Sequence, residues 1–236
     1  MMVVLALAVW QLLYWIVGDI ALRSPAATLR YTFALLERPT IWPHVAESMK
    51  AFAVAIFLAV GIGISIGLIL GFRKLAGQVF EPMLVALYSV PKVTLYPILL
   101  LTFGLGISAK IAFGALHGLI PIALFTINAV RNVRPVLVKA GRAMNYDARE
   151  IATKILIPAA LPEIFSGIRI GLSLTLIGTI LGEMFASQRG LGYMLMNAIG
   201  LHNVDVIMSL TLVLVSFAAV VSSILLAIDR RLHRRF

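Results

Sequence analysis

The stretch VAESMKAFAVAIFLAVGIGISIGLILGF, residues 45–72, decides which class of fold this sequence can adopt. From Ala51 to Phe72 it carries no charged side chain. A helix needs about 20 mostly apolar residues to cross the hydrocarbon core of a bilayer, so this stretch is long enough to span one. Gly63, Gly67 and Gly71 recur at every fourth position, and such small-residue stripes let helices approach closely in lipid. We expect this stripe to pack against another helix.

Similar apolar runs occupy most of the remaining chain, and the composition agrees with a membrane protein. The 236 residues are 61% hydrophobic and only 13% charged, whereas soluble domains carry about 25% charged residues. Further spans are expected at residues 2–20, 80–103, 107–130, 163–185 and 206–228. The first is expected to be a retained helix and not a cleaved signal peptide, because no small-residue cleavage site follows a short apolar core. The sequence therefore predicts an all-α membrane protein with about six transmembrane helices.

The charges favour one orientation in the membrane. The chain has 20 Lys and Arg against 10 Asp and Glu, and most cations lie between apolar runs that end on the same side of a six-helix arrangement. Those cations are Arg73, Lys74, Arg131, Arg134, Lys139, Arg142, Arg149, Lys154, Arg230, Arg231, Arg234 and Arg235. The positive-inside rule then places both termini in the cytoplasm and residues 18–43 and 186–205 in outer loops. Because the cations form short clusters, nucleic acid is not expected as a partner.

The chain divides into residues 1–43, an N-terminal transmembrane helix with an outer loop, and residues 44–236, the membrane core. Several chemistries are not expected of it. Cysteine is absent, and the four histidines, His44, His117, His202 and His233, have no metal-ligand spacing, so we expect no metal site. There is also no Walker A sequence, so the chain is not expected to hydrolyse ATP or to act as an enzyme.

Residues 131–162, RNVRPVLVKAGRAMNYDAREIATKILIPAALP, break the membrane pattern because they combine high charge with apolar residues at helical spacing. Two short amphipathic helices are predicted, with a turn at Asn145, which tolerates the left-handed conformation. Asp147 and Glu150 have the spacing of a capping box at the start of the second helix. Pro158 and Pro162 are expected to end that helix and to start the fifth span. We call residues 131–162 the elbow. The residues alone leave two interpretations of it: a pair of helices that rests on lipid headgroups, or a docking surface for a partner.

Three residues inside the run 80–103 are candidates for a transport pathway. Pro91 and Pro97 release backbone groups, which in a membrane must be satisfied by neighbouring protein or by a wet cavity. They predict either a broken helix beside a pathway or a kink that serves packing. Burying the Lys92 ammonium at this depth in the membrane is unfavourable in free energy unless the ammonium is paired or faces water. It is therefore a candidate to meet an anionic substrate, and a structural pair or snorkelling is the alternative.

The run 163–185 holds further candidates. Glu183 lies near its outer end, where it is expected to brace the loop that follows, and as an intramembrane acid it is also a pathway candidate. Ser173 and Thr175 either line a path or bond back to their own helix. Arg169 is about two turns from Pro162 and is expected to snorkel to the interface.

The elbow resembles the EAA loop of the permease subunits of ATP-binding-cassette (ABC) importers. That loop reads Glu-Ala-Ala, three residues, Gly and later a hydrophobic residue followed by Pro. The matching residues are Lys139, Ala140, Gly141, Asn145, Tyr146, Asp147, Ile157, Pro158 and Pro162. Lys139 stands where the family has Glu, and Asn145 stands where it has Gly. The resemblance implies that residues 136–162 are a cytoplasmic coupling loop that docks an ATPase.

Motifs elsewhere resemble the branch of that family that transports nitrate, taurine, alkanesulfonates, bicarbonate and thiamine-precursor pyrimidines. The resemblance runs from about residue 44 to the C-terminus. Its motifs are Glu47-Ser48, Pro91-Lys92, Tyr96-Pro97, Phe103-Gly104-Leu105-Gly106, Ser108, Lys110, Gly167-Ile168-Arg169, Glu183-Met184 and Gly190-Leu191-Gly192-Tyr193.

The resemblance implies the fold of a type I ABC importer permease in a bacterial inner membrane. The implied partners are a dimer of ABC ATPase subunits, which use ATP and magnesium, a second copy of the permease in a homodimer, and an extracytoplasmic solute-binding protein. The implied cargo is a small polar solute, and this chain itself is expected to bind no cofactor. The alternatives are a structural membrane subunit or an intramembrane enzyme, although no acid, base and nucleophile cluster at depth in the sequence.

Overall fold

The computed structural model describes residues 2–233, which are helical with no strand among them. The α-helices are α1 (Met2–Val17), α2 (Pro25–Leu36), α3 (Trp42–Phe72), α4 (Lys74–Ser89), α5 (Tyr96–Phe103), α6 (Ile107–Arg131), α7 (Pro135–Ala143), α8 (Ala148–Glu150), α9 (Ile157–Ala186), α10 (Leu191–Gly200) and α11 (Val204–His233). Short 3-10 helices lie at η1 (Pro39–Ile41) and η2 (Lys92–Leu95), and a π-helix, η3, at Ile151–Leu156. The predicted all-α class is confirmed.

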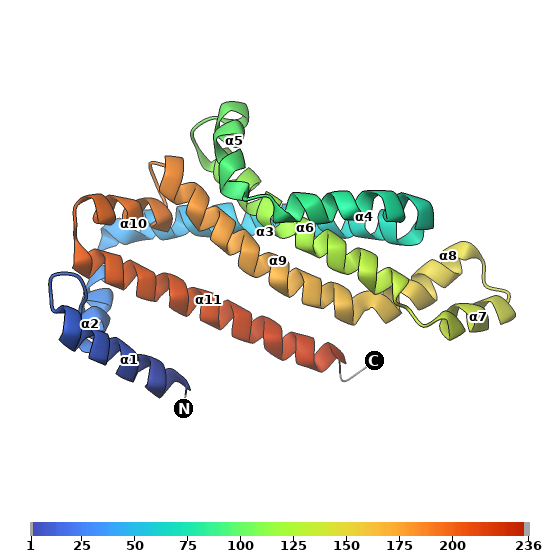
Figure 1. Ribbon diagram of the computed structural model, residues 1–236, viewed down its shortest axis with the longest axis horizontal. Helices are drawn as coiled ribbons and strands as arrows, with labels where there is room; N and C mark the ends of the chain where they lie inside the picture. The colour runs from blue at the N-terminus through green and yellow to red at the C-terminus, as the bar shows by residue number, and fades with distance from the viewer. Residues whose placement is uncertain (1, 234–236) are drawn as a thin grey trace.

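Helices α3, α6 and α9 form the core, and α6 is its centre (Figure 1). In the most apolar 18-residue stretch of each helix, 61% of the residues of α6 are buried, compared with 22% for α3 and none for α11. The predicted packing of the glycine stripe on α3 is confirmed, because it faces α6. A Cβ atom would lie 2.9 Å from the Leu119 carbonyl oxygen if added at Gly63, and 2.9 Å from the Ala123 carbonyl oxygen if added at Gly67. Glycine therefore lets the two backbones approach closely.

Four of the described helices are long and apolar enough to cross a membrane, namely α3, α6, α9 with the segment that precedes it, and α11. A fifth span arises if α4 and η2–α5 are taken together, but these are bent by 91°. The span expected over residues 80–103 is therefore broken, which agrees with the first of the two interpretations of Pro91 and Pro97. Pro91 precedes η2 and Pro97 lies in the first turn of α5, where a missing N–H costs least. The first expected span is the 16-residue helix α1, which is shorter than the other spans.

Both expected outer loops contain a helix, which is a correction to the sequence analysis. Residues 18–43 include α2, whose first turn is capped by the Ser24 hydroxyl accepting from the Ala27 N–H at 3.2 Å, with Pro25 at the first helical position. Ser followed by Pro is a common start of a helix. Residues 186–205 include α10, which packs against α9, α11 and α3.

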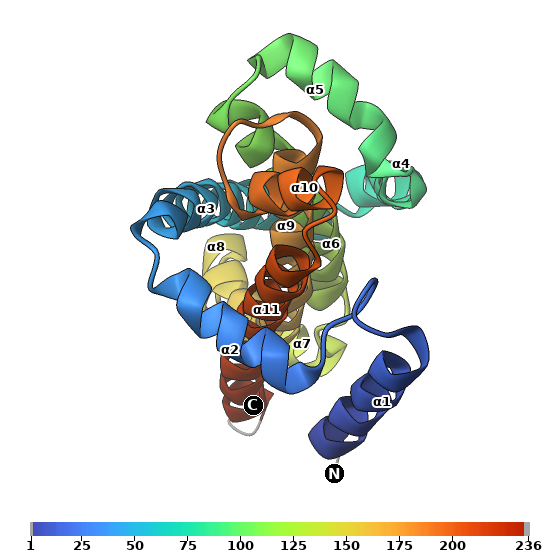
Figure 2. The ribbon, with the colours of Figure 1, turned by 90° about the vertical axis from the view of Figure 1, so that its left-hand side faces the viewer.

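The two ends of the molecule differ. Figure 1 shows α2 and α10 at one end and α7 and α8 at the other, where α3 also turns into α4. At that turn an ion pair between Arg131 and Glu81 joins α6 to α4. In the view along the long axis, α1 and α5 stand away from the core on opposite sides (Figure 2).

The second helix of the elbow does not end at Pro158 or Pro162, so that expectation is wrong. The chain continues from α8 through the π-helix η3 into α9 as one helical segment, Ala148–Phe185. Pro158 lies in the first turn of α9, directly after η3, and Pro162 lies inside α9. The wider π turn changes the hydrogen-bond register just before Pro158, so the helix tolerates a residue that has no N–H there.

Candidate functional site

The elbow between α7 and α9 has the turn that the sequence predicts. Asn145 has φ +57°, the left-handed conformation, and the Tyr146 N–H donates to the Gly141 carbonyl at 3.0 Å. The capping box is also present. The Glu150 N–H donates to Asp147 Oδ1 at 2.6 Å, and the Asp147 N–H donates to Glu150 Oε2 at 3.1 Å. Local chemistry therefore fixes the point where the chain reverses direction.

Side chains on either side of the turn hold the two arms of the elbow together. A Cβ atom at buried Gly141 would collide with the Ile155 side chain, so glycine lets α7 lie directly on η3. Lys154 Nζ lies 2.7 Å from Glu150 Oε1 and 4.7 Å from the centre of the Tyr146 ring. Tyr146 therefore contributes a cation–π contact between the turn and η3. The two arms form one braced unit and not two independent helices.

The face of α7 that carries Val136, Ala140 and Met144 is apolar and exposed. Val136 is 56% exposed and Met144 is 62% exposed, and Ala140 lies between them at helical spacing. Lys139 is exposed beside this face. Of the other predicted docking residues, Ile157, Pro158 and Pro162 are half-buried where the elbow enters α9. An apolar patch with a charged rim is typical of a surface that a partner covers.

The structure does not bring the predicted pathway residues together in this chain. Lys92 is half-buried, and its Nζ donates to the Tyr88 carbonyl at 3.1 Å and lies 4.6 Å from the centre of the Tyr88 ring. Pro91 and Pro97 flank it at the bend between α4 and α5.

Ser173 and Thr175 bond back to their own helix, as one of the two sequence interpretations holds. The Ser173 hydroxyl donates to the Arg169 carbonyl at 3.3 Å, and the Thr175 hydroxyl donates to the Gly171 carbonyl at 2.8 Å. Thr175 is fully buried and faces Gly118 of α6, where a side chain would collide with its hydroxyl. Arg169 lies 3.4 Å from Asp229 and so links α9 to α11.

Glu183 braces the loop after α9, as its position predicts. Its carboxylate is fully buried and accepts from the Ser48 hydroxyl at 2.7 and 2.9 Å and from the Gly192 N–H at 3.0 Å. The Ser48 hydroxyl also accepts from the Leu191 N–H at 2.8 Å. A buried carboxylate needs partners of this kind, because isolated burial of a charge is costly.

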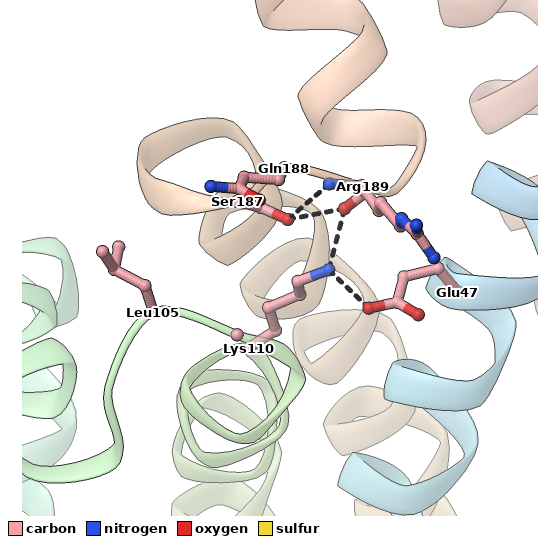
Figure 3. Close-up of a pocket in the computed structure, with 7 residues that line it drawn as sticks. Glu47, Leu105, Lys110, Ser187, Gln188 and Arg189 are labelled. Carbon is pink, nitrogen blue, oxygen red and sulfur yellow. Dashed lines mark hydrogen bonds and ion pairs between the residues drawn. The ribbon is translucent and has the colours of Figure 1, made fainter.

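Lys110 completes this cluster at the end of the core where α10 lies. It is 1% exposed, and its Nζ lies 3.1 Å from Glu47 Oε1, 3.9 Å from Glu183 Oε1 and 2.8 Å from the Arg189 carbonyl. Figure 3 shows this amine reaching from α6 toward Glu47 and the Arg189 carbonyl. A cavity of about 410 Å³ lies beside it, lined by Glu47, Leu105, Gly106, Lys110, Ser187, Gln188 and Arg189.

Lys110 and Glu47 are motif residues of the resemblance, and nothing in the sequence joins them to Glu183. The signal available was that a Lys and an acid stood at neighbouring span ends. Their pairing depends on α3, α6 and α9 packing side by side, which no local pattern reveals.

Comparison with known proteins identifies the family. Residues 59–236 match the family described as binding-protein-dependent transport system inner membrane component. The chain is 30% identical over 194 residues to the putative aliphatic sulfonates transport permease protein SsuC of Bacillus subtilis, covering 81% of this chain and 70% of SsuC. It is also 30% identical over 193 residues to the taurine transport system permease protein TauC of Escherichia coli, covering 82% and 70%.

A third relative is the formylaminopyrimidine transport permease protein ThiX of Halalkalibacterium halodurans, which is 26% identical over 79% of this chain and 75% of ThiX. Among solved structures, the fold is similar to a chain of the MetNI methionine ABC transporter in inward-facing conformations. The TM-score is 0.72 at 22% identity, covering 83% of this chain and 99% of that chain. This likeness confirms the predicted fold of a type I importer permease.

These findings confirm the resemblance to the sulfonate and taurine branch of ABC permeases, and with it the expectation of a transport permease and not an enzyme. Together with the apolar helices they make the chain a multi-pass membrane protein. The chain belongs to the family of binding-protein-dependent transport system inner membrane components.

Proposed function

We propose that this chain is the membrane-spanning permease subunit of an ATP-driven ABC importer in a bacterial inner membrane. Two copies would form a homodimer around the transport path, with a dimer of ATPase subunits in the cytoplasm and a solute-binding protein outside. The observation that carries this proposal is the braced elbow with its exposed apolar face at one end of the core. That patch would cost solubility unless a partner covered it, and the ATPase is the partner that supplies the driving force.

The proposed cargo is a small polar solute: a sulfonate such as taurine, nitrate, bicarbonate or a small heterocycle. The relatives named for sulfonates, taurine and formylaminopyrimidine support this class. ATP and magnesium would bind to the ATPase, while Lys139, Ala140, Asn145, Tyr146 and Asp147 would face it across the cytoplasmic interface and the buried Gly141 would hold the two arms of the elbow together. A structural membrane subunit remains the alternative, and it predicts no uptake at all.

The structure suggests how closure of the ATPases would reach the transport path. Helix α9 follows the elbow without a break and is 30 residues long, or about 45 Å at 1.5 Å per residue. Displacement of the elbow would therefore move α9 as a unit. Because α9 packs along α6, the movement would be transmitted to the helix that forms the centre of the core.

Co-expression with the candidate ATPase and binding protein tests the function. The three proteins are reconstituted in liposomes with the binding protein outside and ATP inside, and uptake of radiolabelled taurine, an alkanesulfonate, nitrate and bicarbonate is measured. We expect ATP-dependent uptake of one solute class at a rate at least about tenfold above liposomes without ATP. Co-purification without any uptake across the panel, together with no stimulation of ATPase activity by loaded binding protein, would favour the structural subunit.

A separate prediction concerns Lys92, whose place beside the α4–α5 bend keeps it a candidate for meeting anionic cargo. We expect Lys92→Ala to lower uptake about tenfold or more, because a desolvated ammonium–anion hydrogen bond is strong, while assembly with the ATPase is unchanged. Lys74→Ala, an exposed cation at the start of α4, serves as the control. Unaltered KM and maximal uptake rate in Lys92→Ala would remove this residue from the pathway.

A further inference from the structure

The main chain of residues 189–192, where the loop after α9 leads into α10, makes hydrogen bonds to side chains of α3, α6 and α9. Each residue from 189 to 192 offers one main-chain polar group to a side chain of another element. The Arg189 carbonyl accepts from Lys110 of α6, and the Gly190 N–H donates to His44 Nδ1 of α3 at 3.1 Å. As described above, the next two N–H groups bond to Ser48 and Glu183.

Two glycines bring this loop within reach. Gly190 has φ +120°, which favours glycine, and a Cβ there would collide with the Glu183 carboxylate. A Cβ at Gly192 would lie 2.7 Å from Glu183 Cβ. The loop therefore rests directly on Glu183, and α10 begins at that contact. His44 also stacks on Tyr193 of α10, with ring centres 6.0 Å apart.

The buried charges would remain paired if the loop left. Lys110 contacts two carboxylates, Glu47 at 3.1 Å and Glu183 at 3.9 Å, as well as the loop carbonyl. Neither acid belongs to the loop. Lifting the loop would break the hydrogen bonds from its main chain to Lys110 and Glu183, but it would leave the Lys110 ammonium between Glu47 and Glu183, so this buried cation would keep its carboxylate partners. A cavity of about 410 Å³ adjoins the loop, since Ser187, Gln188 and Arg189 line it together with Lys110.

We infer that Lys110, Glu183 and Ser48 form a releasable clamp on residues 189–192, and that this loop and α10 move as the outer gate of the transporter. The three residues are positioning residues: they hold α10 against the outer ends of α3, α6 and α9. The exposure of the Leu191 side chain shows whether the clamp is closed. In this structure the side chain is 3% exposed and packs with Leu35, Ile41 and Leu210, and release of the loop would expose it.

Cysteine labelling tests the clamp, and this chain has no native cysteine, so label found on it reports on the introduced residue alone. Leu191→Cys is introduced into the full complex in membranes, and its reaction with a membrane-impermeant maleimide is timed. We expect Ser48→Ala in this background to raise the labelling rate about tenfold, because the loop loses an acceptor and Glu183 loses a donor. Ser65→Ala is the control, since that serine also lies on α3 but its hydroxyl only bonds back to the Gly61 carbonyl at 2.7 Å. Equal labelling in Ser48→Ala and Ser65→Ala would overturn the clamp.

The gating role rests on the proposed transport function and needs a second measurement. His44→Cys with Tyr193→Cys joins α3 to α10 through a short bifunctional thiol reagent with a reducible link. We expect linked complexes to lose at least about nine-tenths of their uptake and reduction to restore it, as for other gated steps. Uptake at the unlinked rate in fully linked complexes would refute the gate. Absence of uptake by the parent permease, which keeps His44 and Tyr193, would instead refute the proposed function, while the labelling result would still report on the clamp.

Discussion

Replacement of Ala140 by Asp is expected to abolish coupling between ATP hydrolysis and uptake while leaving the membrane core folded. Ala140 is exposed at the middle of the apolar face of α7, between Val136 and Met144. Covering a new carboxylate with an apolar partner surface costs at least about 3 kcal/mol, which is about a hundredfold in affinity. The purified variant should therefore lose its ATPase subunits on a sizing column and should show no uptake.

The matched control for this change is Ala27→Asp. Ala27 is also exposed but lies in the first turn of α2, at the opposite end of the molecule, where an acid is favourable to a helix. We expect it to keep full ATPase binding and uptake. Wild-type ATPase affinity in Ala140→Asp, measured by light scattering of the complex, would remove the docking role from α7.

Replacement of Gly67 by Ala should destabilise the core, whereas the same replacement at Gly61 should not. A Cβ at Gly67 would collide with the Thr126 side chain near its root and lie 2.9 Å from the Ala123 carbonyl oxygen, so neither neighbour can move away easily. Overpacking of this kind costs about 1–3 kcal/mol. At Gly61 no atom lies within 4 Å of the added methyl, and alanine favours a helix over glycine by about 1 kcal/mol.

Thermal unfolding of the two purified variants in the same detergent separates these effects. The midpoint should fall for Gly67→Ala and should stay equal or rise for Gly61→Ala. Both glycines lie on α3 and the mutation is identical, so differences in helix propensity cancel. If Gly67→Ala melts with or above the parent protein, the close contact between α3 and α6 is not a determinant of stability.

The elbow could be predicted from the sequence because its determinants are local. Asn145 sets the turn, and Asp147 and Glu150, three residues apart, form the capping box. The same holds for the glycine stripe of α3, whose spacing indicates one helical face. The short helix α2 is not predicted from the sequence, although Ser24 and Pro25 are common at the start of a helix, because residues 18–43 are expected to form a loop between spans.

The position of Glu183 predicts its contact with the loop after α9, but its contacts with Ser48 and Lys110 could not be predicted, because they join distant parts of the chain. Ser48 and Glu183 are separated by 135 residues, and Ser48 and Leu191 by 143. Their meeting depends on how α3, α9 and α10 pack, and the sequence contains no local sign of that packing. The bend between α4 and α5 lies between these cases: Pro91 predicts a break, but no local pattern in the sequence gives the angle of 91°.

The unbroken course of α9 from the elbow to Glu183 has a geometric consequence. A rigid rod of about 45 Å that tilts by about 10° at one end displaces its other end by about 8 Å. Hydrogen bonds near 3 Å cannot stretch over such a distance. A modest rotation at the elbow would thereby be amplified at the Glu183 end of α9, so the backbone contacts of residues 189–192 would either travel with that end or separate.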